Sequence, residues 1–198
     1  MKKTAYAVLL ALALPAGLAA QQQPSGGAPS NPITTAFRGR TMTLQRNLAQ
    51  AFDSIPENLY GYKPTPVQLT VGYVAQHLAS DNYFFCSQFG DMKPAAAAMD
   101  TATADSVKAT WPKARLVENL KASFAFCEQA FAQLDDAKLA DQVTMTFRGQ
   151  SRQVTRASMV LGHDLDMADH YSQIANYMRL NHLIPPTALP RPGQGAAH

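Results

Sequence analysis

Apolar residues recur every three or four positions in four segments of the chain, which is the period of an amphipathic α-helix. We therefore expect helices at about residues 34–55, 71–88, 112–134 and 156–181. Pro56 ends the first segment, and Pro112 suits the first turn of the third helix. Thr70 and Thr155 stand directly before the second and fourth segments, where a threonine hydroxyl can accept a hydrogen bond from the first turn.

In the connections between these segments the apolar residues show less regular spacing. Residues 89–111 show no clear period, and we expect a long connection with one short helical turn at most. Residues 143–147, "VTMTF", alternate like a short strand, but no partner strand is evident. We interpret them as an extended connector to the fourth helix. Four helices without a sheet predict an all-α fold, a four-helix up-and-down bundle.

The N-terminus has the order of a secretory signal peptide. "MKKTAYAVLLALALPAGLAA" places two lysines before an apolar run, then Pro15 and small residues, so we assign residues 1–20 to the signal. Residues 21–35 are rich in Gln, Pro, Ser and Gly and are typical of a flexible linker. The bundle then covers 36–187, and 188–198 form a flexible tail. We expect an exported protein, periplasmic or secreted, with no membrane attachment after cleavage.

Charge and cysteine content narrow the class of protein. Loss of Lys2 and Lys3 with the signal peptide lowers the basic count from 17 to 15, against 14 acidic residues, so nothing predicts a nucleic-acid partner. Cys86 and Cys127 are too far apart in the sequence for a CxxC motif. In an oxidising compartment they could pair and tie the second helix to the third. The alternative is two buried thiols used as small apolar residues.

The fourth segment contains the candidate chemistry. In "LGHDLDMADHYSQIANYMRL", residues 161–180, a rotation of about 100° per residue places His163, Asp166 and His170 on the apolar, inward face. Asp164 and Asp169 are expected to face water. Polar groups buried without partners cost several kcal/mol each, so something must satisfy the three inward ones.

The second helix offers a counterpart. His77 lies in its apolar stripe, and with Asp166 and His170 it would supply two imidazoles and a carboxylate. Such a set suits a divalent transition metal that keeps one position open. Asp81 or His163 could add a further ligand or hold an imidazole by a hydrogen bond. A buried hydrogen-bonded network without metal fits the same pattern.

One other kind of helical bundle is excluded and a second is disfavoured. A ferritin-like di-iron site needs inward ExxH steps, and none of Glu57, Glu118 and Glu128 lies three residues before a histidine. A four-helix haem protein could use His77 or methionines as axial ligands, but the chain has no CxxCH to attach the haem, which disfavours this alternative.

Three stretches together are similar to a known family. "VGYVAQHLASDNYFFCS", "LKASFAFCEQAF" and "ADHYSQIANYMRLNHLIPP" occur in this order, and the similarity covers about residues 36 to 187. The chain resembles the DinB/YfiT-like metalloenzymes, in particular their small exported members. The resemblance implies a four-helix bundle with a metal site made by one histidine of the second helix and an HxxxH step of the fourth.

Carried over to this chain, the resemblance implies His77, Asp166 and His170 as ligands, with Asp166 where the family has a histidine. The expected cofactor is zinc or nickel, with iron or manganese as the other options. Relatives commonly form homodimers.

Characterised relatives also include thiol-dependent transferases and a mycothiol-dependent isomerase. Because such thiols are cytoplasmic, a metal-dependent hydrolase acting on a small, unidentified molecule is the second option for an exported chain. The non-enzymatic alternative is an exported bundle with a vestigial metal site that binds a small ligand or partner.

Overall fold

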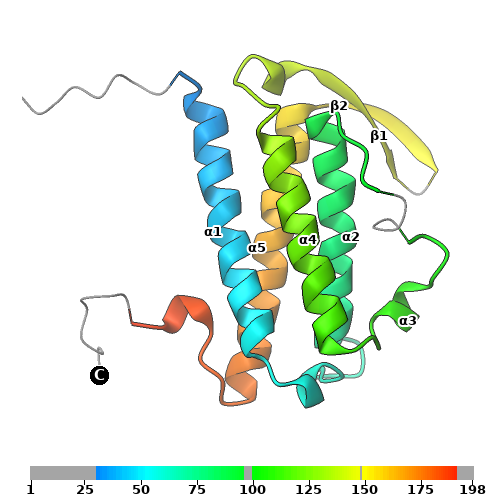
Figure 1. Ribbon diagram of the computed structural model, residues 1–198, viewed down its shortest axis with the longest axis vertical. Coiled ribbons are helices and arrows are strands. Elements are labelled where there is room, and N and C mark those ends of the chain that lie inside the picture. Colours follow the sequence, from blue (N-terminus) through cyan, green and yellow to red (C-terminus); the bar gives the residue numbers. More distant parts are fainter. Residues whose placement is uncertain (1–29, 96–99, 148, 191–198) are drawn as a thin grey trace, which may run out of the picture.

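The computed structural model describes residues 30–95, 100–147 and 149–190, and it shows a bundle of four long helices (Figure 1). The long helices are α1 Pro32–Ser54, α2 Val71–Gly90, α4 Lys113–Phe131 and α5 Arg156–Leu180. Each of α1 and α2 packs against both α4 and α5, which gives the bundle a square cross-section. The predicted four-helix bundle is confirmed, and its apolar stripes form two core clusters, the smaller of which contains Cys86 and Cys127.

Shorter elements join the long helices. They are η1 Glu57–Leu59, α3 Asp105–Lys108, η2 Lys138–Ala140, β1 Gln142–Phe147, β2 Gln150–Thr155 and η3 Pro186–Ala188. The helix α3 is the single turn expected in the long connection. This connection returns the chain to the lower end of the bundle, so α2 and α4 run in the same direction (Figure 1). The parallel run also appears in matched side-chain pairs, Asn82 with Ser123 and Cys86 with Cys127.

Two of the long helices start at residues that the neighbouring sequence marks, and one does not. Thr70 and Thr155 cap α2 and α5 as predicted, each accepting a hydrogen bond of 3.1 Å from a backbone N–H three residues on. The start of α1 differs, because this helix begins at Pro32, inside the segment 21–35 predicted as linker. Here the Asp136 carboxylate, which follows α4 in the chain, accepts hydrogen bonds from the N–H groups of Ile33 and Thr34. The predicted signal peptide lies outside the described residues.

The segment 142–155 corrects the sequence interpretation. The stretch "VTMTF" is not a lone connector, since β1 pairs antiparallel with β2 in a hairpin in which Met145 faces Arg152 and Val143 faces Val154. Gly149 takes a φ of 76° in the turn, a conformation that glycine adopts without strain. Buried Arg156 fixes the hairpin, because it donates to the Phe89 carbonyl oxygen at 2.8 Å.

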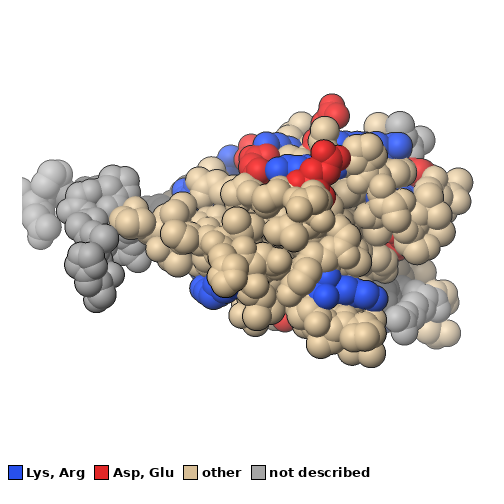
Figure 2. All heavy atoms as spheres, turned by 90° about the horizontal axis from the view of Figure 1, so that it is seen from below, with Lys and Arg blue, Asp and Glu red and all other residues tan. Residues whose placement is uncertain are grey.

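The surface gives two further observations. Seen from below, acidic and basic side chains gather together along one edge of the bundle, two separate basic patches lie in the lower part of the view, and most of the remaining face is uncharged (Figure 2). Charges of both signs therefore lie side by side mainly along that one edge. Among the described helices, none is long and apolar enough to cross a membrane.

Candidate metal centre

Three of the predicted ligands meet between α2 and α5. Each of His77, Asp166 and His170 offers one nitrogen or oxygen atom, and these atoms lie within 4.8 Å of one another. The two imidazole rings stand edge to face with their centroids 5.0 Å apart. The three predicted donors therefore do converge, and their separation suits a shared ion, since two metal–ligand bonds of about 2.0–2.2 Å each span a little over 4 Å.

A chain of hydrogen bonds fixes the tautomer of His170. The Gln173 amide nitrogen donates to the Tyr177 hydroxyl at 2.8 Å, and this hydroxyl donates to the Leu69 carbonyl oxygen at 3.0 Å. The Gln173 oxygen is thereby turned towards His170 and can only accept, so Nδ1 of His170 carries the hydrogen across 3.2 Å. In the neutral ring the lone pair of Nε2 is then free. The sequence analysis missed Gln173 as an orienting residue, although it lies one turn after His170.

Nε2 of His170 faces a carboxylate oxygen. It lies 3.5 Å from Oδ1 of Asp166, so the two atoms form an ion pair when the ring is protonated and are two facing acceptors when it is neutral. The other oxygen of Asp166, Oδ2, is buried with no hydrogen-bond partner. Burial raises the pKa of the Asp166 carboxyl, partly offset by attraction to the two histidines. A cation between these atoms would satisfy all of them, so the donor set fits a metal ion.

The second imidazole is also ready to bind. Burial and the neighbouring His170 lower the pKa of His77, so its ring is neutral at pH 7. Asp81 lies one turn further along α2, with Oδ2 3.3 Å from Nε2 of His77. Burial, together with repulsion from Asp166, raises the pKa of Asp81 to about 7. Asp81 is therefore placed to hold the His77 ring in position.

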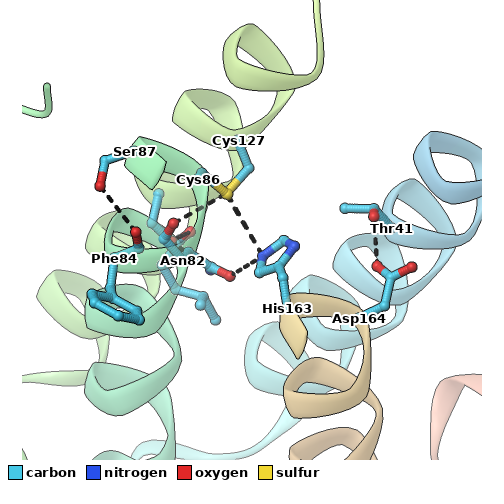
Figure 3. The surroundings of a disulfide bond; sticks show 10 residues. Thr41, Asn82, Phe84, Cys86, Ser87, Cys127, His163 and Asp164 are labelled. Carbon is cyan, nitrogen blue, oxygen red and sulfur yellow. Dashed lines mark hydrogen bonds between the residues drawn. A yellow bond between two sulfur atoms is a disulfide. The ribbon is translucent and has the colours of Figure 1, made fainter. Parts of the chain in front are cut away.

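His163 is not part of this cluster, which corrects the expectation that it could be a further ligand. It is fully buried beside the disulfide, where its Nε2 lies 2.8 Å from Oδ1 of Asn82 (Figure 3). Asn82 in turn donates to Ser123. The physical reason is the helix rise: seven residues separate His163 from His170, or about 10 Å along the axis. The predicted buried network is therefore correct for His163, and the predicted cluster for the other three.

The cysteines form a disulfide between α2 and α4, the pairing that the sequence had left as one of two hypotheses (Figure 3). Their sulfur atoms lie 3.7 Å from Nε2 of His163. These three residues also converge, but disulfide sulfurs are not thiolates, so the trio is not a metal site. Asp164 is a second correction: it is buried against α1, where it accepts a hydrogen bond of 2.6 Å from Thr41.

Buried His163 should make the protein acid-sensitive. Burial lowers its pKa to about 3, against 6.5 for the ordinary side chain, so between these values the unfolded state binds a proton that the folded state excludes. The free energy of unfolding should therefore fall by about 1.4 kcal/mol per pH unit below pH 6.5 from this residue alone. Urea unfolding from pH 4 to 7, with chelator present, should show a shallower slope for His163→Gln. Equal slopes in the two proteins would contradict the assignment.

Fold and site together define a class, a four-helix bundle with a His–Asp–His cluster between two of its helices. Within this class the chain belongs to the DinB superfamily, whose sequence profile matches residues 41–174. The matched segment contains all three cluster residues. A search of curated proteins finds no match.

Solved structures support the same fold. A DinB-like protein from Bacillus cereus is 17% identical, with a TM-score of 0.60, over 77% of this chain and 95% of that one. A conserved protein from Enterococcus faecalis is also 17% identical, with a TM-score of 0.56, over 75% and 96%. A mycothiol-dependent maleylpyruvate isomerase is 13% identical, with a TM-score of 0.56, over 71% of this chain and 60% of that one. At these identities the likeness establishes the fold alone.

Proposed function

We propose that this protein is an exported metalloenzyme that binds a divalent transition metal through His77, Asp166 and His170 and uses it on a small molecule. Zinc or nickel is the expected ion, because two imidazoles and one carboxylate suit both. The observation that carries the proposal is the convergence of one nitrogen or oxygen atom from each of His77, Asp166 and His170 to within 4.8 Å of one another.

The chain's own residues would prepare the site. Gln173 holds His170 in the tautomer whose Nε2 can bind an ion, and Asp81 holds the ring of His77. The side chains of His77 and Asp166 are 31% and 21% exposed, whereas that of His170 is 10% exposed. The cluster is thus enclosed by protein on one side and open on the other, which would let a substrate reach the ion.

Hydrolysis is the reaction that these residues support best. A divalent ion supplies Lewis-acid polarisation of a carbonyl and acidifies a bound water. Thiol transfer is less well supported, because the described part of the chain contains no free cysteine and any thiol would have to come from outside. Export is supported by the N-terminal sequence pattern and by the buried disulfide, a bond that persists in oxidising compartments.

Metal binding tests the proposal directly. Chelator-treated protein should take up one zinc or nickel ion per chain, measured by elemental analysis after removal of free metal. An ion present at 100 times its dissociation constant stabilises the fold by about 2.7 kcal/mol, so the melting temperature should rise by several degrees.

A matched pair of histidine variants provides the control. His77→Asn should abolish the shift, whereas His182→Asn, at an exposed position beyond α5, should keep it. Esters and amides of small carboxylic acids should then be turned over only by the metal-loaded protein. Failure to bind an ion would overturn the proposal, and binding without turnover would favour the non-catalytic alternative.

A further inference from the structure

A cavity of about 330 Å³ lies beside the candidate metal centre, between α2, α5 and the hairpin. Asp81 lines this cavity and also contacts His77. On the opposite wall is Gly162, one helical turn before Asp166. The cavity therefore adjoins the metal centre, and its volume is at the lower end of the range for ligand pockets, about 300–1,000 Å³.

The walls of the cavity are mostly apolar. Its apolar residues are Phe84, Phe85, Met145, Val154 and Met159. Gly162 lets the Phe85 ring pack closely against α5, since a Cβ atom there would lie 3.1 Å from a ring carbon of Phe85. An elongated apolar group is the natural occupant of such a space.

One cation stands out against this apolar lining. Arg152 lies opposite Met145 in the hairpin, on the face that also carries Val143 and Val154, where a further apolar residue would be expected. Its side chain is exposed, and its hydrogen-bond partner among the described residues is the Met145 sulfur at 3.9 Å, a weak acceptor. No carboxylate among the described residues forms an ion pair with it. By contrast, Arg156, four residues later in the sequence, forms ion pairs with both Asp91 and Asp141.

We propose that this cavity binds an amphipathic carboxylate, with the apolar body between the hairpin and the helices and the carboxylate on Arg152. A guanidinium binds a carboxylate through paired hydrogen bonds, which gives Arg152 the partner that it lacks. Asp81 lies at the end of the cavity that adjoins His77, away from the hairpin that carries Arg152. The uncharged reactive end of the molecule then points to the metal centre. This last part rests on the proposed function, whereas the binding by Arg152 does not.

A larger cavity of about 690 Å³ at the start of α2 is a weaker candidate. It is lined by Tyr73, but neither by the three cluster residues nor by Asp81. Its two lysines already donate hydrogen bonds, Lys113 to the carbonyl oxygens of Asp53 and Ile55, and Lys63 to that of Pro66. None of the three cluster residues lines the smaller cavity either, but Asp81 connects it to His77, and its Arg152 forms no ion pair among the described residues.

Octanoate and its neutral analogue octanol test the cavity without metal. In chelator, octanoate should shift the NMR signals of the Met145 and Met159 methyl groups, and Arg152→Gln should weaken octanoate binding about tenfold but leave octanol unchanged. Arg179→Gln, an exposed cation at the end of α5, is the matched control and should change neither. Gly162→Leu, with its melting temperature checked, should abolish both. The inference is overturned if octanoate leaves the methyl signals unmoved or binds Arg152→Gln as well as wild type.

The metal-loaded protein tests the orientation. The monohydroxamate of octanedioic acid carries a metal-binding group at one end and a carboxylate at the other. It should bind about tenfold more tightly than octanohydroxamate, and Arg152→Gln should remove that advantage. Equal affinities in wild type would overturn the orientation. If the protein binds no ion, the proposed function fails but the octanoate result still decides the cavity.

Discussion

Replacing Asp166 with alanine is expected to weaken zinc or nickel binding by at least about 100-fold. Loss of a residue that only supports a ligand typically costs about 10–100-fold, and Asp166 is expected to touch the ion itself. Asp166→His should bind the ion at least as tightly as wild type, because it creates the HxxxH step that the family resemblance implies for this helix. Isothermal titration of chelator-treated proteins would measure both changes.

The control for this experiment comes from the structure. Asp169 is exposed on the outer side of α5, so Asp169→Ala should leave the affinity within about twofold of wild type. Asp164 would be a poor control, since its hydrogen bond to Thr41 holds α1 against α5. If Asp166→Ala and Asp169→Ala lose metal equally, Asp166 is not a ligand. If Asp166→Ala binds no ion but melts at a higher temperature than wild type, the buried carboxylate destabilises the wild-type fold and no bound ion compensates for it.

Breaking the disulfide is expected to lower the free energy of unfolding by about 4 kcal/mol. Cys86 and Cys127 close a loop of 41 residues, and this value is the chain-entropy expectation for such a loop. The melting temperature should fall on the order of 10 °C. Urea unfolding with and without reductant would measure the difference.

Two forms of the protein separate the cross-link from the packing. Reduced wild type keeps both sulfur atoms beside His163, so its loss of stability reports the cross-link alone. The double variant Cys86→Ala, Cys127→Ala also empties space in the fully buried core and should be less stable than the reduced protein. A reduced protein within about 1 kcal/mol of the oxidised one would show that the disulfide stabilises little.

Most of the fold could be predicted because its signals are local. The period of the apolar residues located the four long helices, and Thr70 and Thr155 marked two of their starts through hydrogen bonds made within one turn. The start of α1 could not be predicted in this way, because it depends on Asp136, about 100 residues away in the sequence.

The hairpin was missed because its second strand looks like a loop. β2 is polar and mostly exposed, so it shows no clean alternation, and its inward face is formed by Val154 and the unexpected Arg152. The available signal was the short turn at Gly149 between two stretches rich in β-branched residues.

The candidate site shows what a helical projection can and cannot decide. It correctly placed His77, Asp166 and His170 on facing stripes, but it discards the rise along the axis and so could not separate His163 from His170. Asp164 was misjudged for a different reason: α5 packs against both α1 and α2, so its buried arc is wider than one stripe.

The disulfide and the metal centre also differ in when they can form. Both cysteines precede α5 in the chain, so the bond between α2 and α4 can close while the last helix is still unfolded. The cluster needs Asp166 and His170 and therefore can be assembled only after α5 has docked on α2. A bound ion would then mark the final step of maturation, and metal content would distinguish completed molecules from oxidised but unfinished ones.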